Sequence, residues 1–205
     1  MSRAAHLLSA AAHPGRVELR RMRWWDSPGV ILLEHAAFPD DAWSVGMFWS
    51  ELAESATRYY LVAEEFEPKD EDSRLIGYAG LLAGVGEAEV LTIAVDPAHE
   101  GRGLGAVLLT ELMREAALRD CDDVVLEVRV DNDRAQQLYR RFGFEGVGIR
   151  KGYYQPMNID ALVMRSSDVI ARFGGESAAA HENGNGNGAR GKGKHSLKSV
   201  DWVRE

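Results

Sequence analysis

The chain has 205 residues, and its 24 Lys and Arg against 32 Asp and Glu give a formal net charge of −8. This acidic balance argues against a dedicated nucleic-acid-binding protein, which would show a basic face, and it suits cationic substrates better than anionic ones. A single cysteine, Cys121, excludes an internal disulfide framework and a cysteine-based zinc cluster.

Both ends of the chain differ in composition from its middle. Residues 1–15 are expected to form a flexible extension, because their short apolar patch is broken by histidines and does not resemble a signal peptide. Residues 167–205 are expected to form a disordered Gly/Asn/Lys-rich tail, since the alternating Asn-Gly run at 183–188 can bury almost nothing. The basic residues of this tail could form a tether to an anionic partner such as a ribosome, but a solvated segment is the favoured interpretation. A folded domain is therefore predicted at residues 16–166.

Within this domain the hydrophobic pattern first predicts a strand at residues 17–23 and a helix that Asp26 could cap and that runs to about Phe38. Ser44 can cap a second helix, in which apolar residues recur at helical spacing. Three strands follow, at residues 58–66, 74–85 and 88–95. A polar hairpin loop at 67–73 joins the first two. Consecutive strands without intervening helices imply antiparallel pairing.

The second half of the domain alternates between strand and helix. The expected elements are a helix at 103–119, a strand at 123–130, a helix at 133–142 and strands at 144–150 and 159–164. Gly143 fits as the left-handed residue that ends the last helix. A strand, a helix and a further strand in succession imply a parallel crossover. The predicted fold class is therefore mixed α/β, with a mostly antiparallel sheet of about seven strands, four helices and one parallel crossover.

The glycine-rich loop between residues 91 and 109, LTIAVDPAHEGRGLGAVLL, is the most informative stretch. Gly101, Gly103 and Gly105 open a helix, where backbone N–H groups lack internal partners and can bind an anion such as phosphate. Gly101, Gly103 and Ala106 also fit a dinucleotide-binding fingerprint. That fingerprint follows its strand directly at the first crossover of a parallel sheet, whereas here a five-residue loop intervenes. Glycines that only permit a tight turn are the remaining alternative.

Four segments together resemble the GNAT superfamily of N-acetyltransferases over residues 16–165. They are IAVDP from Ile93, GRGLGAVLL from Gly101, LEVRVDN from Leu126 and LYRRFGF from Leu138. Within the superfamily, the LEVR motif, the AVDP run and the pair of tyrosines resemble the ribosomal-protein-alanine N-acetyltransferases of the RimI type. The resemblance implies the GNAT fold, acetyl-CoA as co-substrate and no metal ion, consistent with six histidines that show no metal-ligand spacing.

The resemblance also implies the contacts with acetyl-CoA. Backbone groups of three residues would pair with the pantetheine arm like an added strand: Ile93, Ala94 and Val95. Backbone N–H groups of the loop would cradle the pyrophosphate: Gly101, Arg102, Gly103, Leu104, Gly105 and Ala106. Asn132 would contact the cofactor at the next helix start. The family usually has Gln or Arg where this chain has Glu100, a carboxylate that would repel the pyrophosphate unless Arg102 offsets it.

Glu127 interrupts the apolar run VVLEVRV, and a carboxylate in such a strand requires a reason. One interpretation is an ion pair with Arg129 on the same face. The resemblance implies instead a general base. A carboxylate acting through a water molecule is a weak base, so it suits an α-amine of pKa about 7.7–8.0 better than a lysine of pKa about 10.4. This argument independently favours an N-terminal substrate.

Tyr139 lies on the apolar face of its predicted helix, so it could be an ordinary core aromatic. The resemblance implies a general acid that protonates the departing CoA thiolate. Candidate walls of a peptide groove are Phe38, Trp43, Tyr153 and Tyr154, each of which could equally be packing residues.

The sequence therefore predicts an acyltransferase that moves acetyl from acetyl-CoA to a protein N-terminal α-amine, with an N-terminal alanine of a small-subunit ribosomal protein as the expected acceptor. The main alternative is a broader acetyltransferase that acts on lysines or small amines. A non-catalytic CoA-binding module and a dinucleotide-dependent oxidoreductase are further alternatives. The expected partners are protein or peptide N-termini, without direct nucleic-acid binding. Because no run of about 18 apolar residues occurs, we expect no membrane span and a cytoplasmic location.

Overall fold

The computed structural model describes residues 16–40, 42–66 and 73–176. The expected extension at 1–15, most of the hairpin loop at 67–73 and the expected tail beyond Glu176 lie outside the described residues.

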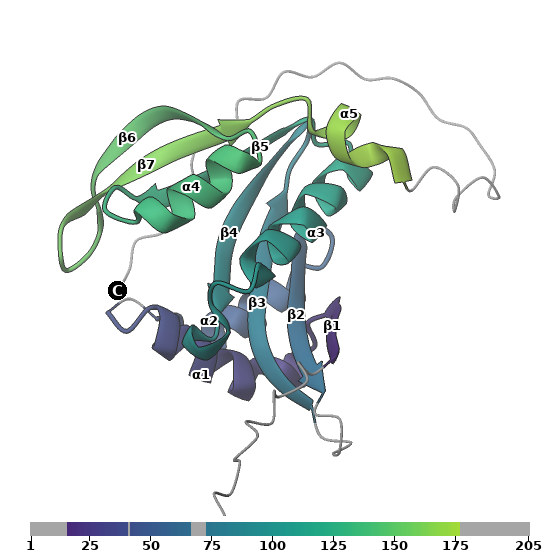
Figure 1. Ribbon diagram of the computed structural model, residues 1–205, viewed down its shortest axis with the longest axis vertical. Coiled ribbons are helices and arrows are strands. Elements are labelled where there is room, and N and C mark those ends of the chain that lie inside the picture. The colour runs from purple at the N-terminus through teal and green to yellow at the C-terminus, as the bar shows by residue number, and fades with distance from the viewer. Residues whose placement is uncertain (1–15, 41, 67–72, 177–205) are drawn as a thin grey trace, which may run out of the picture.

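Seven strands form one mixed sheet in the order β1-β2-β3-β4-β5-β7-β6 (Figure 1). Their bounds are β1 Arg16–Arg21, β2 Arg58–Phe66, β3 Ser73–Ala83, β4 Glu87–Val95, β5 Asp123–Arg129, β6 Glu145–Tyr154 and β7 Ile159–Ser166. Strands β4 and β5 pair in parallel, and the other neighbouring pairs of the described sheet are antiparallel. The predicted mixed sheet with one parallel crossover is therefore confirmed.

Helices cover both faces of this sheet. They are α1 Ser27–Ala37, α2 Val45–Ala53, α3 Leu104–Leu118, α4 Asp133–Arg141 and α5 Val169–Phe173. Helices α1 and α2 contact β2–β4 on one face, whereas α3 contacts the same strands on the other face and forms the crossover from β4 to β5 (Figure 1). Helix α4 packs on the same core cluster as α3, through Ala135, Leu138 and Tyr139.

The fifth helix corrects the predicted boundary at residue 166. Residues 167–176 were expected to begin the tail, but they include α5 and a short 3-10 turn that contact α3. Val169 is fully buried, and its N–H donates to the Asp122 carbonyl at 3.0 Å. A helix of five residues is too short to give a recognisable hydrophobic period, so the sequence pattern did not reveal it.

Local signals at helix ends were correct at two positions and wrong at a third. Ser44 accepts a hydrogen bond from the Met47 N–H at 3.3 Å, and Gly143 adopts the left-handed conformation at φ 76°. Asp26 precedes α1 but does not cap it with its side chain. Its buried carboxylate instead binds Arg20 at 2.6 and 2.8 Å and the Arg23 N–H at 2.7 Å.

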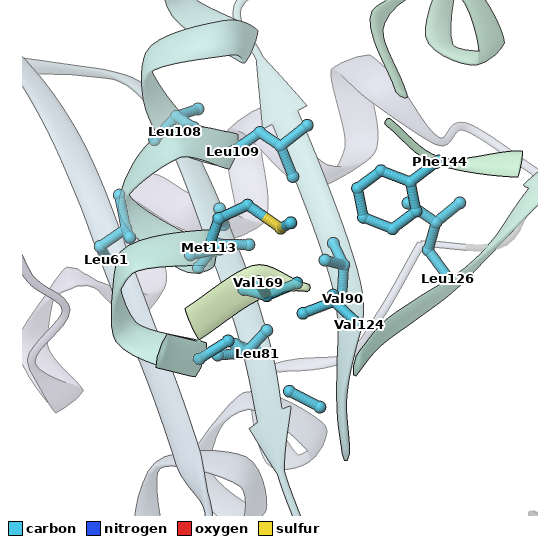
Figure 2. Packing of buried hydrophobic residues seen from close by; sticks show 14 of the residues in the cluster. Leu61, Leu81, Val90, Leu108, Leu109, Met113, Val124, Leu126, Phe144 and Val169 are labelled. Carbon is cyan, nitrogen blue, oxygen red and sulfur yellow. The ribbon is translucent and has the colours of Figure 1, made fainter. Parts of the chain in front are cut away.

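The larger core cluster lies between α3 and the sheet. Figure 2 shows Leu108, Leu109 and Met113 of α3 above Leu81 and Val90 of the strands. Burial of each such side chain contributes roughly 1.5–3 kcal/mol, so this layer fixes α3 and with it the glycine loop at its start. Cys121 is a free cysteine buried in the same cluster, so it contributes to the packing of the core.

Strands β4 and β5 pair over a short length and then diverge. Their parallel ladder runs from Glu87 opposite Asp123 to Val90 opposite Leu126, although β4 continues to Val95. The register of β4 against β3 shifts at the same level, which leaves Leu91 as an extra residue. A bulge of this kind bends its strand. The second half of β4 therefore separates from β5 and leaves a backbone edge between the two halves of the sheet.

Candidate active site

The edge of β4 beyond Val90 carries the backbone groups predicted to bind pantetheine. Ile93, Ala94 and Val95 pair with β3 on one side, opposite Ala79, Tyr78 and Gly77. Their other side faces the divergence from β5, where the described residues provide no further strand pairing. An extended ligand with amide groups can add to such an edge as a strand. The geometry therefore fits the predicted role of these three residues.

The glycine loop ends in an uncapped helix start. Gly101 and Gly103 have φ values of 77° and 86°, a region that L-residues rarely adopt. A Cβ atom at either position would meet nothing within 4 Å, so the backbone conformation requires the glycines and the space beside them is open. Gly103 precedes α3 without a side-chain cap, which leaves first-turn N–H groups available to an anion. The Ala106 N–H is already engaged, since it donates to the Gly103 carbonyl at 3.0 Å.

The charges around this loop differ from the expectation. Glu100 forms an ion pair with Arg134 in the first turn of α4, rather than facing the loop unopposed. Arg102 lies 3.8 Å from Glu65, so it does not offset Glu100. Asn132, predicted to contact the cofactor, caps α4 by accepting a hydrogen bond from the Ala135 N–H at 3.0 Å. A cofactor contact by Asn132 therefore stays a prediction.

Glu127 lies on the face of β5 opposite the larger core cluster. Leu126 and Val128 are buried in that cluster, and strand alternation places the Glu127 carboxylate on the other face. Its side chain is 10% exposed, and its Oε1 lies 3.0 Å from Nη1 of Arg150 in β6. Arg129 binds Asp131 at 2.8 Å. Glu127 thus forms an ion pair with Arg150, a partner on another strand that the sequence did not predict.

Two of the four predicted wall residues lie beside Glu127. The Tyr154 hydroxyl donates to the Glu127 carbonyl at 3.3 Å, and the Tyr153 and Tyr154 rings meet edge to face at 5.1 Å. The Arg150 guanidinium lies 5.7 Å from the Tyr153 ring centre. Phe38 and Trp43 instead pack against the second core cluster, under α1 and α2, where Trp43 lies 5.4 Å from the Phe48 ring.

Tyr139 lies on the opposite face of the sheet from Glu127. It is half-buried against the larger core cluster, with its ring centre 5.8 Å from that of Phe144. Burial raises the pKa of its phenol to about 12. The core interpretation and the predicted acid role are therefore compatible, because the ring packs while the hydroxyl stays protonated at neutral pH.

Glu89 is a residue that the sequence analysis did not select. It lies on β4, and burial together with the nearby Glu127 carboxylate raises its pKa to about 7. The signal was present: Glu89 interrupts an apolar strand, AEVLTIAV, in the same way as Glu127 interrupts its own. Arg150 was also missed, since only the folding of β6 beside β7 brings it to β5. Within the described ranges, no cluster of three or more His, Cys, Asp or Glu residues could hold a metal ion.

Comparisons with known proteins match most of the folded part of the chain. The sequence model of the acetyltransferase (GNAT) family matches residues 18–144. The N-alpha-acetyltransferase RimI of Mycobacterium tuberculosis is 44% identical over 131 residues, which cover 62% of this chain and 76% of that protein. The ribosomal protein bS18-alanine N-acetyltransferase of Salmonella typhimurium is 35% identical over 143 residues, which cover 68% of this chain and 89% of that protein.

A solved structure agrees with these sequence relatives. The crystal structure of the ribosomal-protein-alanine N-acetyltransferase from Escherichia coli superposes with a TM-score of 0.65 at 27% identity. The superposition covers 75% of this chain and 94% of that one. The overall fold of this chain therefore has an experimentally solved counterpart. No helix in the described ranges is both long and apolar enough to cross a membrane.

Proposed function

The chain belongs to the acetyltransferase (GNAT) family, and we propose that it transfers acetyl from acetyl-CoA to the N-terminal α-amine of a protein. The acceptor we propose is the N-terminal alanine of a small-subunit ribosomal protein, because relatives at 35–44% identity are named for such N-terminal chemistry. A ribosomal substrate would place the enzyme in the cytoplasm, where ribosomes are assembled.

The observation that carries the proposal is the position of Glu127 and Tyr139 on opposite faces of the sheet, with Glu127 just beyond the end of the pairing of β5 with β4. A thioester held along the β4 edge would have a carboxylate on one side and a phenol on the other. The edge residues Ile93, Ala94 and Val95 support binding of the pantetheine arm, and the open loop at Gly101 to Gly105 supports binding of the pyrophosphate.

In the proposed reaction, Glu127 removes a proton from the ammonium group of the substrate through a water molecule. The neutral amine then attacks the thioester carbonyl, the new C–N bond forms and the C–S bond breaks. Tyr139 donates its phenolic hydrogen to the departing sulfur. Full transfer from a phenol of pKa about 12 to a thiolate of ordinary pKa about 8.5 costs about 5 kcal/mol. The main contribution of Tyr139 is therefore a hydrogen bond to the thiolate, which lasts until the product leaves.

Arg150 is proposed to orient Glu127 for this step, because its Nη1 lies 3.0 Å from the Glu127 Oε1 and can hold that carboxylate in place. Tyr154, which donates to the Glu127 backbone carbonyl, and Tyr153, which contacts Tyr154, are the wall residues we retain for the peptide. Phe38 and Trp43 are proposed to shape the groove indirectly, through the packing of α1 and α2.

Mass spectrometry after incubation with acetyl-CoA and two peptides tests the proposal. One peptide begins with Ala-Arg and has a free N-terminus, and the other has a blocked N-terminus and an internal lysine. Acetylation of the first alone is expected, and Glu127→Gln should reduce its rate at least 100-fold, as loss of a general base does. Comparable acetylation of the lysine would replace the proposal with the broader acetyltransferase. CoA binding without transfer to any amine would favour a binding module.

A further inference from the structure

Two carboxylates from neighbouring strands lie side by side at the point where β4 and β5 diverge. Glu89 is paired in register with Val125, two residues before Glu127 on β5. Because residues in register point to the same face and side chains alternate along a strand, Glu89 and Glu127 share one face of the sheet. Their carboxyl groups are close enough to hydrogen-bond to each other.

The positive charge around the pair is too small for two ionised carboxylates. The charged groups that face Glu89 are Glu127 from β5, Arg150 from β6 and Arg58 from β2. Arg150 binds Glu127 directly at 3.0 Å, whereas Arg58 binds Glu51 of α2 at 2.6 Å. Glu51 also accepts a hydrogen bond from the Tyr60 hydroxyl at 2.9 Å, and it already neutralises much of the Arg58 charge.

This arrangement lets the pair bind one proton near neutral pH, so the forms with and without that proton coexist there. Two carboxylates that share a partly buried site cannot both ionise at the ordinary pKa of glutamate. Burial and the Glu127 charge raise the pKa of Glu89 to about 7, against the opposite effect of the two arginines. Arg150 contacts Glu127 and the raised pKa is that of Glu89, so we place the shared proton on Glu89, in a hydrogen bond to Glu127.

We propose that Glu89 and Glu127 form a proton-sharing pair that receives the proton released by the attacking amine, with Glu89 as its second member. This inference rests on the proposed function and deepens it. In the reactive form the pair has released its proton to solvent, so it can accept another. The ammonium group gives its proton to Glu127 through water, and the pair then holds this one proton in the Glu89–Glu127 hydrogen bond. The amine forms the C–N bond, the C–S bond breaks, and the pair releases its proton to solvent after product leaves.

The pair would have a pKa closer to that of the substrate amine than a single carboxylate has. An ordinary glutamate has a pKa near 4.3, more than three units below an α-amine at about 7.7–8.0. A base is most effective when its pKa lies near that of the group it deprotonates and near the working pH. A pair that takes up its proton near pH 7 lies about one unit from an α-amine, but more than three units from lysine at about 10.4.

The pH dependence of kcat/KM with the Ala-Arg peptide tests the pair in Glu89→Gln, which keeps the shape and a hydrogen-bond donor to Glu127. Ionisation of the substrate amine affects the kcat/KM of every variant equally. Differences between the pH profiles of the variants therefore come from ionisation of enzyme groups. From pH 6 to pH 8 the wild-type value should rise about tenfold more than that of Glu89→Gln, as deprotonation of a group of pKa about 7 predicts. Glu89→Gln should also lower kcat about tenfold at pH 8 while the dissociation constant for acetyl-CoA stays unchanged.

Glu87→Gln is the matched control, because Glu87 lies two residues earlier on the same face of β4 and binds Arg165 at 2.8 Å. This variant should keep the wild-type profile. If Glu89→Gln also keeps the wild-type profile and kcat, the proposal is overturned. A uniform loss at all pH values together with weaker acetyl-CoA binding would show a merely structural role and would equally overturn it.

A second measurement separates the pair from the proposed function, because it needs no substrate. Infrared difference spectra between pH 6 and pH 8 detect the C=O band of a protonated carboxylic acid. The band should disappear over this range in the wild type, be absent in Glu89→Gln and titrate at lower pH in Glu127→Gln. A titrating band in an enzyme that acetylates no α-amine would refute the proposed function but keep the pair. Acetylation without such a band would refute the pair alone.

Discussion

At the scale of single residues, Tyr139 combines a packing role in the core with a proposed role in catalysis. Its ring packs 5.8 Å from that of Phe144, and burial raises the pKa of its hydroxyl to about 12. Tyr139→Phe keeps the ring and removes the hydrogen-bond donor. We expect kcat to fall by about 10²-fold, in the range of acid–base contributions, without change in acetyl-CoA affinity. Steady-state kinetics with calorimetric titration of CoA would measure both.

The control for this variant is Tyr59→Phe. Tyr59 is another half-buried tyrosine whose pKa burial raises, but it lies on β2 beside Arg21, 4.2 Å from its ring centre. Its loss should leave kcat unchanged. Equal activity of Tyr139→Phe and the wild type would remove Tyr139 from the mechanism and leave only its packing role.

Single residues also show where sequence reasoning reaches its limit. Glu127 could be selected because a carboxylate within an apolar strand is visible in the sequence, and the same signal marks Glu89. Its partner could not be predicted. Arg129 is two residues away along the chain, yet Arg150 of β6 binds Glu127 across the intervening strand β7. Long-range partners follow from topology, which no local spacing encodes.

At the scale of elements, the strands and helices were predicted well because their signals are local. Alternation gave the strands, Ser44 marked a helix start and Gly143 marked a helix end. Helix α5 was missed because its five residues dock through Val169 on α3 and the sheet rather than through a period of their own. The bulge at Leu91, which separates β4 from β5, was likewise absent from the sequence prediction, since it depends on the register with β3.

The glycine loop allows a prediction at this same scale. Gly103 has φ 86°, so Gly103→Ala would cost about 1–2 kcal/mol unless the loop changes conformation. Because the N–H groups of this loop are proposed to bind the pyrophosphate, we expect acetyl-CoA affinity to fall about tenfold, measured by calorimetric titration. Gly86→Ala is a matched control, with φ 77°, open space at its Cβ and a position in the β3–β4 turn. Similar weakening in both variants would contradict the proposed loop contact.

At the scale of the whole molecule, the site should make folding stability depend on pH. A carboxyl whose folded pKa is raised to about 7 stabilises the fold below the unfolded pKa of about 4.3, and this contribution is lost as pH rises towards 7. Asp26 and Glu64, whose pKa values Arg20 holds below their usual range, act in the opposite direction and lose their contribution only as pH falls below about 4. Removal of the Glu89 carboxylate should therefore stabilise the protein at pH 8 but not at pH 4.

We expect Glu89→Gln to raise the free energy of unfolding by about 1–3 kcal/mol at pH 8, since each unit of pKa shift corresponds to about 1.36 kcal/mol and partial solvation reduces the total. Urea unfolding followed by circular dichroism at pH 4, 6 and 8 would measure the difference, which should shrink steadily towards pH 4. A variant destabilised equally at all three values would show that Glu89 supports the fold. If Glu89→Gln is more stable at pH 8 but transfers acetyl more slowly, Glu89 lowers the stability of the wild-type fold while it raises the activity. The wild type would then give up some folding stability for a base whose pKa is close to that of an α-amine.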